Sequence, residues 1–236
     1  MNGLLLVDKP AGISSFDVIR QLKRILIEAN LPLNHRGKKI LPKIGHAGTL
    51  DPAASGLMLI LIGSATKQAQ YLIKLNKVYA AEITLGANSS TGDRDGELTS
   101  ISKLEPSQAE IEAALQSYTG AITQTPSVYS AIKIDGKEAY KRARAGETVD
   151  MPSRDITIYS NEFIAYQYPK IQLISSVSSG TYIRSLAEDI GRDLGTGGYL
   201  SALVRQSVGK YELRDAIDLK NATHEFVEQN THPIRF

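Results

Sequence analysis

The stretch that decides how this chain folds is GHAGTLDPAASGLMLILI, from Gly45 to Ile62. It joins a loop of small residues, ending at Gly56, to a continuous apolar run that predicts a buried strand. Pro52 disfavours the helical region for the residue before it, so we expect Asp51 to be presented from an extended or turning backbone. The small residues allow a bulky planar group to approach the backbone closely. An ordinary turn between strands is the alternative, because Asp, Pro and Gly are the usual residues of turns.

Composition indicates a globular protein and excludes several kinds of site. The 236 residues are 42% hydrophobic, which is enough for a substantial core. Cysteine is absent, so disulfides, thiolate nucleophiles and cysteine zinc sites are excluded. The four histidines show no tight metal-ligand spacing, and we expect no metal site. The apolar runs are too short for a signal peptide or a membrane span, so we expect a cytoplasmic protein without a membrane anchor.

Positive charge is concentrated in the first third of the chain. Residues 1–80 hold eleven Lys or Arg against four Asp or Glu, a net +7, although the whole chain carries only +2. Such a basic region suits a polyanion such as nucleic acid, and a solvated charged surface is the alternative. The polar loop Asn30–Lys43 adds four cations just before the small-residue run, where they contact phosphates or belong to a mobile insertion.

Hydrophobic periodicity predicts a mixed α and β chain. Ser14 and Asp17 approximate a capping box that opens a helix reaching Leu26. The other expected helices are Ser64–Ile73, Ser107–Tyr118, Lys137–Ala145, Thr181–Leu194 and a weak one in the tail. The expected strands are Asn2–Val7, Leu57–Ile62, Lys77–Leu85, Val128–Ile134, Ile156–Ile164, Ile171–Val177 and Tyr199–Val208.

A lone loop carboxylate needs a partner that fixes its charge and orientation, and Arg184 is the candidate. It lies in SSGTYIRSLAED, from Ser178 to Asp189, in the first turn of a helix, where an arginine opposes the helix dipole. A buried arginine beside Asp51 would keep the carboxylate ionised as a nucleophile. An exposed helical arginine is the alternative.

Tyrosine is prominent, with eleven Tyr, four Phe and no Trp. Tyr79, at the start of a strand, is placed to stack on a nucleobase, and a half-buried strand tyrosine is the alternative. Aromatic and basic residues also alternate between Tyr129 and Arg144, as at a nucleic-acid contact surface or on a solvated helix face. Asp93, Asp95 and Gly96 form only a fragment of a calcium loop. Phosphate-binding glycine loops and a serine nucleophile elbow are absent from the sequence.

Five ordered motifs together resemble the TruB family of tRNA pseudouridine synthases, and the resemblance runs through most of the chain. The motifs are LLLVDKPAGISSFDV, GHAGTLDPAASGLMLILIGSATK, KVYAAEITLG, PSVYSAIKIDGKEAYKRARAG and SSGTYIRSLAEDIG. The resemblance implies an α/β fold of the α+β type: a single catalytic domain with a mixed, mostly antiparallel central sheet flanked by helices. This domain would span residues 1–215, with an RNA-contacting insertion at about 123–152 and a short tail over 216–236. This sequence is expected to depart from many relatives in two ways: it would lack a C-terminal PUA domain, and its connection at Leu31–Ile44 is longer.

The resemblance implies isomerisation of uridine to pseudouridine in the tRNA T loop, by base flipping and without a cofactor. Asp51 would be the nucleophile, Arg184 its ion-pair partner, and Tyr79 the stacking platform and possible proton acceptor. His46, Tyr182, Leu203 and Lys9 would line or brace the pocket. The expected RNA contacts in the insertion are Tyr129, Lys133, Lys137 and Tyr140.

Two functions from other classes stay open. A non-catalytic RNA-binding or tRNA-folding protein would use the same basic surface and bind a T-arm stem-loop without converting it. A glycoside hydrolase would need a second carboxylate about 5 to 10 Å from Asp51, and the motif offers none. We expect a monomer whose partner is tRNA.

Overall fold

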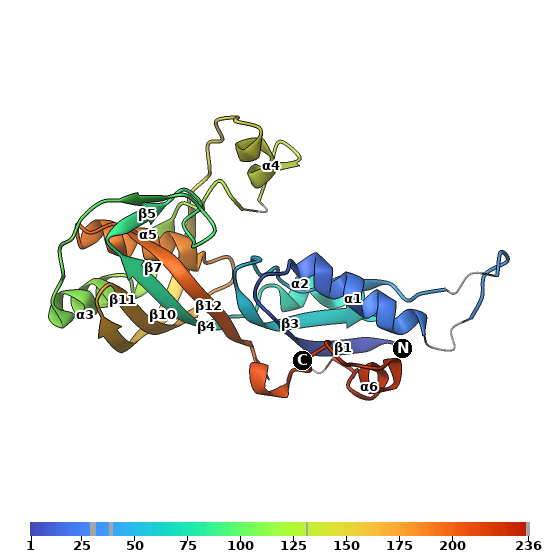
Figure 1. Cartoon of the computed structure of the whole chain (residues 1–236). Coiled ribbons are helices and arrows are strands. Elements are labelled where there is room, and N and C mark those ends of the chain that lie inside the picture. Colours follow the sequence, from blue (N-terminus) through green and yellow to red (C-terminus); the bar gives the residue numbers. More distant parts are fainter. Residues whose placement is uncertain (29–31, 38–39, 131, 235–236) are drawn as a thin grey trace. The chain divides into compact units, whose positions relative to one another are not determined.

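Figure 1 shows the computed structural model, which describes residues 1–28, 32–37, 40–130 and 132–234. The chain divides into two compact units: unit 1 comprises Met1–Val78 and Val204–Phe236, and unit 2 comprises Tyr79–Leu203. Two strands, β4 (Lys77–Leu85) and β12 (Gly198–Val208), have residues in both units. Within the described residues, no helix has the length and apolar character needed to cross a bilayer.

Unit 1 is built on the apolar strand β3 (Ser55–Ile62), which is buried on both faces from Gly56 onward. β1 (Gly3–Lys9) pairs with it antiparallel along its whole length, from Gly3 opposite Ile62 to Lys9 opposite Gly56. β2 (Ile44–His46) is also antiparallel to β3, whereas β12 is parallel to it, with Val204 opposite Ser55. The strand order β1-β3-β12 therefore places the end of the small-residue loop between two strands distant in sequence.

Helices and turns complete unit 1. α1 (Ser15–Ile27) starts at a capping box formed by Ser14 and Asp17, as its sequence predicts, and buries one apolar face. The 3₁₀ helix η1 (Gly63–Gln68) continues into the short helix α2 (Ala69–Leu72). After β12 come β13 (Tyr211–Glu212), η2 (Leu213–Asp215) and α6 (His224–Gln229). Leu4 and His232 exchange backbone hydrogen bonds, which brings the two ends of the chain together in this unit (Figure 1).

Unit 2 contains the longer antiparallel strands. Its strand order is β12-β4-β11-β10-β7, and the hairpin of β10 (Arg154–Gln167) and β11 (Lys170–Val177) forms its centre. β7 (Gly120–Gln124) borders β10, with Gln124 opposite Arg154. α3 (Gln108–Ser117) and α5 (Ile183–Asp193) pack their apolar faces into this unit, and β5 (Ala87–Ser89) pairs with β6 (Leu98–Ser100).

A segment with a small core of its own lies within unit 2. It comprises β8 (Lys133–Ile134), β9 (Lys137–Glu138) and α4 (Ala139–Arg144), the last labelled in Figure 1. Ala139, Val149 and Met151 form its buried centre, with three partly buried residues packed around them. We refer to residues 123–152 as the insertion.

The observed elements confirm the expected mixed, mostly antiparallel sheet flanked by helices. Three expected elements are wrong in detail. Among the described residues of Val128–Ile134, which omit 131, strand pairing is limited to Lys133 and Ile134 in a short hairpin. Lys137 begins β9 rather than a helix, and Ser64–Ile73 starts as 3₁₀ helix and becomes α-helical only at Ala69–Leu72. Of the expected loop Asn30–Lys43, the residues 30, 31, 38 and 39 lie outside the described part of the chain.

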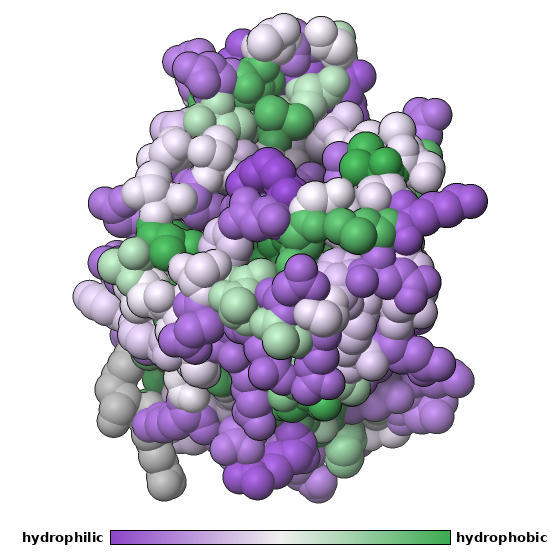
Figure 2. Space-filling model, turned by 90° about the vertical axis from the view of Figure 1, so that its left-hand side faces the viewer, coloured by the Kyte–Doolittle hydropathy of each residue, from purple (hydrophilic) through white to green (hydrophobic). Residues whose placement is uncertain are grey.

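Figure 2 shows one face of the molecule, where hydrophilic side chains predominate and apolar patches lie separately between them. Exposed large apolar side chains belong to several different elements, among them Phe16 of α1, Leu98 of β6 and Ile164 of β10. Scattered apolar side chains of this kind are normal for a folded protein and indicate no particular docking surface.

Candidate active site

The backbone on both sides of Asp51 is held by residues from the start of the chain. The Ser15 hydroxyl donates to the Leu50 carbonyl at 2.9 Å and accepts from the Leu50 N–H at 2.8 Å. The Gly12 N–H donates to the Pro52 carbonyl at 2.8 Å. A further bond joins the N–H of Ala54 to the carbonyl of Asp51 at 3.1 Å and closes a turn. Asp51 therefore stands in a turn whose flanking peptide groups are both fixed, as Pro52 predicts.

Lys9 holds the same loop through hydrogen bonds of its buried ammonium group. Its side chain is fully buried, and its ammonium group donates to the carbonyls of Pro10 and Ile13 at 2.9 and 2.8 Å, with the Pro52 carbonyl at 3.4 Å. Burial lowers the pKa of Lys9 to about 8, against the opposing effect of the Asp51 carboxylate. Lys9 thus braces the turn and places a cation near Asp51.

Arg205 of β12 fastens the rest of the loop to the sheet. This side chain is 1% exposed and donates to three carbonyls: Leu57 at 2.7 Å, Gly48 at 3.1 Å and Thr49 at 3.3 Å. Gly56 has a φ of +104°, and a Cβ atom there would lie 2.4 Å from the carbonyl oxygen of Arg205. The glycine is therefore required where β3 and β12 approach each other.

His46, at the end of β2, is half-buried in unit 1. Burial and the positive charge of Arg205 both lower the pKa of His46, so the neutral imidazole is favoured. Its Nδ1 atom is buried and has no hydrogen-bond partner. The ring therefore retains an unused polar atom, which a structural histidine in a fully satisfied core would not have.

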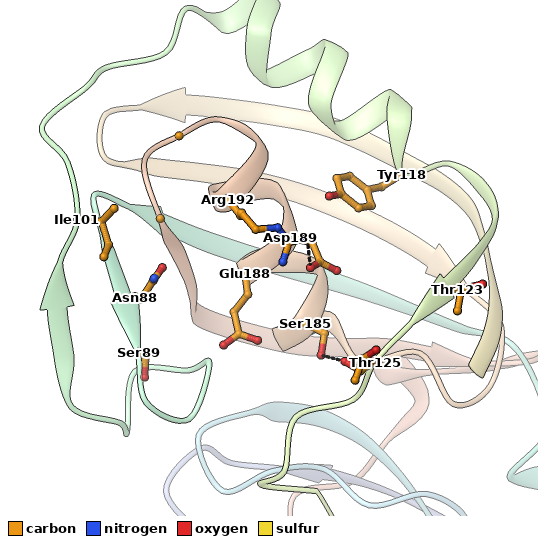
Figure 3. A pocket seen from close by; sticks show the side chains of 12 residues that line it. Asn88, Ser89, Ile101, Tyr118, Thr123, Thr125, Ser185, Glu188, Asp189 and Arg192 are labelled. Atoms are coloured by element: carbon orange, nitrogen blue, oxygen red, sulfur yellow. Dashed lines mark hydrogen bonds and ion pairs between the residues drawn. The ribbon is translucent and has the colours of Figure 1, made fainter. Parts of the chain in front are cut away.

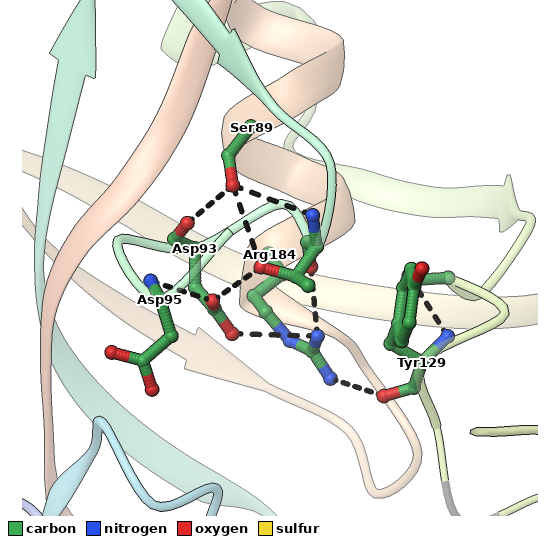
Figure 4. Close-up of polar contacts among 7 residues, drawn as sticks. Ser89, Asp93, Asp95, Tyr129 and Arg184 are labelled. Atoms are coloured by element: carbon green, nitrogen blue, oxygen red, sulfur yellow. Dashed lines mark hydrogen bonds and ion pairs between the residues drawn. The ribbon is translucent and has the colours of Figure 1, made fainter. Parts of the chain in front are cut away.

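In unit 2, Arg184 lies at the start of α5 within a network of polar contacts (Figure 4). It is 5% exposed, so the alternative of an exposed helical arginine is wrong. Its Nη1 donates to the Thr91 carbonyl at 2.8 Å and lies 3.4 Å from an Asp93 carboxylate oxygen, while Nη2 donates to the Tyr129 carbonyl at 2.9 Å. Asp93 in turn accepts from the Thr91 hydroxyl at 2.6 Å and the Asp95 N–H at 3.1 Å. The guanidinium is thus held in one orientation by a buried carboxylate and two carbonyls.

Tyr182 immediately precedes α5 and is fixed by Gln124. The Gln124 amide donates to the Tyr182 carbonyl at 3.0 Å and accepts from the Tyr182 N–H at 2.8 Å. Gln124 is almost completely buried at the end of β7. This paired contact fixes the backbone two residues before Arg184.

Tyr79 and Leu203 lie on the two strands that have residues in both units. Tyr79 is on the buried face of β4, 8% exposed, and is more deeply buried than the half-buried strand tyrosine considered as its alternative. Leu203 is half-buried in β12. Their roles at a uridine pocket stay predictions.

Three of the four predicted RNA contacts of the insertion lie on the β8-β9 hairpin and α4, whereas the fourth, Tyr129, accepts from Arg184 through its carbonyl. Lys133 and Lys137 are exposed on the β8-β9 hairpin. Tyr140 is partly buried in α4, with Lys141 and Arg144 over its ring at 5.8 and 5.6 Å from the centroid. The insertion therefore combines aromatic and cationic groups on one small helix.

Unit 2 also contains a cavity of about 820 Å³ that the sequence does not indicate (Figure 3). Ser185, Glu188 and Arg192 of α5 line it, together with Asn88 and Thr125. Burial raises the pKa of Glu188, which favours its neutral form more than in water. The cavity is lined by both polar and apolar side chains, and we assign it no catalytic role.

The predicted site residues therefore form two groups. Lys9, His46 and Asp51 belong to unit 1, and the remaining eight belong to unit 2. The Asp51–Arg184 ion pair stays a prediction. Sequence reasoning missed Arg205, Asp93 and Gln124. A lone arginine in the apolar run of β12 was the available signal for the first, whereas in the sequence Asp93 forms only part of a calcium-loop fragment.

Comparison with known proteins places these features in a family. A family model described as "TruB family pseudouridylate synthase (N terminal domain)" matches residues 36–183. A protein of Burkholderia lata named tRNA pseudouridine synthase B is 42% identical over 93% of this chain, which spans 64% of that protein's length. A protein of the same name from Fusobacterium nucleatum is 43% identical over 90% of the chain, which spans 70% of that protein's length. Another from Opitutus terrae is 42% identical over 93% of the chain, which spans 86% of its length.

Solved structures show the same fold. A chain in the crystal structure of a Cbf5-Nop10-Gar1 complex matches 98% of this chain with a TM-score of 0.71 and 26% identity, over 60% of its own length. A chain in the structure of an H/ACA RNP bound to a substrate RNA containing 2′-deoxyuridine matches 92% with a TM-score of 0.65 and 26% identity, over 51% of its length.

Proposed function

Because this chain belongs to the TruB family of pseudouridylate synthases, we propose that it isomerises uridine to pseudouridine in the T loop of tRNA, at position 55 of the tRNA. The observation that carries the proposal is the braced turn at Asp51, in which the peptide groups before and after the carboxylate are both hydrogen-bonded. A carboxylate with a fixed backbone suits attack at one defined atom. The relatives named tRNA pseudouridine synthase B support the choice of tRNA as substrate.

In the proposed reaction the bond from the uracil N1 to the ribose breaks, the base turns, and a new bond joins C5 to the ribose. The C5 proton leaves and N1 ends protonated, so atoms and charge balance without an oxidant or a phosphate donor. Asp51 is the nucleophile, and Arg184 pairs with it and keeps it ionised. Tyr79 stacks on the uracil and accepts the C5 proton.

Flipping the uridine out of a folded loop costs roughly a few kcal/mol of unstacking, which contacts in the pocket must offset. The small residues of the Asp51 loop leave room for the flipped base. His46 contacts the RNA at the pocket entrance, Tyr182 and Leu203 line the pocket, and Lys9 braces it. The lowered pKa of His46 supports this role, because a neutral imidazole can accept a hydrogen bond from RNA.

The insertion is proposed to hold the T arm through Tyr129, Lys133, Lys137 and Tyr140. Exposed lysines supply affinity for phosphates, and an aromatic ring beside them suits stacking. We propose further that the protein acts as a monomer in the cytoplasm.

Pseudouridine mapping of a T-arm transcript tests this function. The wild type should convert one uridine, and Asp51→Asn should lose conversion while keeping RNA affinity within about tenfold, because the amide is not a nucleophile. Asp218→Asn makes the same change at an exposed carboxylate of unit 1 and should remain active.

A non-catalytic RNA-binding or tRNA-folding protein is the other candidate, because the basic insertion alone would serve it. That function would give binding of the transcript by wild type with no pseudouridine at any position. Substantial conversion by Asp51→Asn would instead show that Asp51 is not the nucleophile.

A further inference from the structure

Arg154, the first residue of β10, lies directly over the ring of Tyr182. Its guanidinium carbon is 4.7 Å from the ring centroid, a distance typical of a cation–π contact. Arg154 is also the cross-strand neighbour of Gln124, which holds the backbone of Tyr182. Two adjacent residues of the β7-β10 pair therefore fix Tyr182, one through its peptide groups and one through its ring.

The guanidinium of Arg154 has donors without acceptors. Its Nε and Nη2 atoms are buried and have no hydrogen-bond partner. By contrast, Arg142, Arg184 and Arg192 of the same unit each have a carboxylate within 4 Å. The next residue, Asp155, accepts instead from the hydroxyl of Thr123. Arg154 is partly buried and has no carboxylate partner among the described residues, so an anion would stabilise its charge.

The exposed turn before α5 lies beside Nη1 of this guanidinium. Gly180 is exposed and has a φ of +88°, and a Cβ atom there would lie 3.5 Å from Nη1 of Arg154. Hydrogen bonds from Thr181 to the Ser178 carbonyl and from Ser178 to Thr157 fix this turn. An anion that approaches beside Gly180 would meet Nη1 first. Nε and Nη2 are buried, so such an anion would accept from the N–H groups of Nη1 while the guanidinium stays stacked on Tyr182.

We propose that Arg154 binds a backbone phosphate of the RNA substrate. Its guanidinium stacks on the ring of Tyr182, which precedes Arg184 by two residues in the sequence, so the phosphate would be bound beside the start of α5. The proposal rests on the proposed function, since it takes RNA as the ligand. A planar guanidinium stacked on an aromatic ring is suited to phosphate, because it is weakly hydrated, always charged and held in one orientation. Arg154 also stands at the end of the insertion, so that one phosphate would be held between the insertion and the start of α5.

The salt dependence of RNA binding tests the phosphate contact. Binding of the T-arm transcript is measured between about 50 and 300 mM salt for wild type, Arg154→Gln, Arg154→Lys and the control Arg192→Gln. Loss of one phosphate contact reduces the slope of log Kd against log salt by about 1. We expect that reduction, with affinity weakened about fivefold to tenfold, only for Arg154→Gln. Arg154→Lys should keep the slope, and Arg192→Gln, which removes a 68% exposed arginine, should match wild type.

A scan of single methylphosphonates along the transcript locates the phosphate. One neutral linkage should weaken binding by wild type and have no further effect on Arg154→Gln. This loss of additivity would not arise from a purely structural role, and melting curves check that each variant is folded. If Arg154→Gln does not fold, Arg154→Lys and the scan on wild type are compared instead, and a scan in which no linkage matters overturns the proposal.

An unchanged salt slope for folded Arg154→Gln, or full additivity at every linkage, also overturns it. Wild type that neither binds nor converts the transcript would count against the proposed function itself. Wild type that converts the transcript while Arg154→Gln keeps the same slope would count against the phosphate contact alone.

Discussion

At the scale of single residues, hydrogen bonds from distant residues hold the backbone around Asp51. Ser15 and Gly12 bond the peptide groups on either side of it, and Arg205 bonds three carbonyls of the same loop. Buried carbonyls that lose their donor cost about 1–3 kcal/mol each. Arg205 is therefore expected to control both stability and the position of Asp51.

Arg205→Met should lower the free energy of unfolding by about 3 kcal/mol or more, because it removes the buried donor from those carbonyls. Conversion of the T-arm transcript should fall more than the folded fraction does. Denaturant titration and conversion assays below the melting temperature measure both effects. Arg214→Met, at a 77% exposed arginine, is the control. Equal stability and activity of Arg205→Met and wild type would show that the loop does not depend on this arginine.

Lys77 makes the stability of the folded state depend on pH. It is buried and donates to the carbonyls of Ile73 and Leu75, and burial together with Arg205 lowers its pKa to about 8. Between this value and the usual 10.5, the unfolded chain binds a proton that the folded chain has lost. The stability of the folded state therefore rises with pH in this window, by roughly 1 kcal/mol per pH unit from this group.

Denaturant titrations from pH 8 to 10 test the contribution of Lys77. Lys77→Met should show a flatter rise in unfolding free energy than wild type, and Lys74→Met, at an exposed lysine, should follow wild type. Parallel curves for Lys77→Met and wild type would mean that Lys77 stays charged in the folded state at pH 9.

At the scale of elements, the parallel pairing of β3 and β12 depends on Gly56. Gly56 and Gly120 have similar φ values, +104° and +109°, but an added Cβ would collide with the backbone of Arg205 only at Gly56. Gly120→Ala should cost only the backbone strain, about 1–3 kcal/mol. Gly56→Ala should cost considerably more, since β3 and β12 must separate. Melting temperatures of the two variants measure the difference, and equal losses would contradict the close approach.

The same elements show what local sequence can predict. Three elements are predicted correctly from local signals: β3 from its continuous apolar run, β4 from its alternation and α1 from its capping box. The predictions for Val128–Ile134 and Lys137 are wrong because these elements are short and depend on a small separate core. Period alone carries little information over two residues.

At the scale of the whole molecule, the site residues missed from sequence act through contacts between distant segments. Arg205 lies more than 140 residues from Leu57, and Gln124 lies 58 residues from Tyr182, so no local pattern reports their partners. The resemblance carried by five ordered motifs supplied Asp51, Tyr79 and Arg184 instead. The structure adds the braces around the first and third of these residues.

The central claim is that Asp51 enables exchange of the uracil linkage in RNA. Pseudouridine formation must release the hydrogen at C5, whichever atom the carboxylate attacks. The most direct measurement is tritium release from a T-arm transcript that carries [5-³H]uridine only at the target position. Wild type should release tritium up to one equivalent per transcript, and Asp51→Asn should release no more than a sample without enzyme. Release by folded Asp51→Asn at a rate within tenfold of wild type, or none by wild type, would contradict the account.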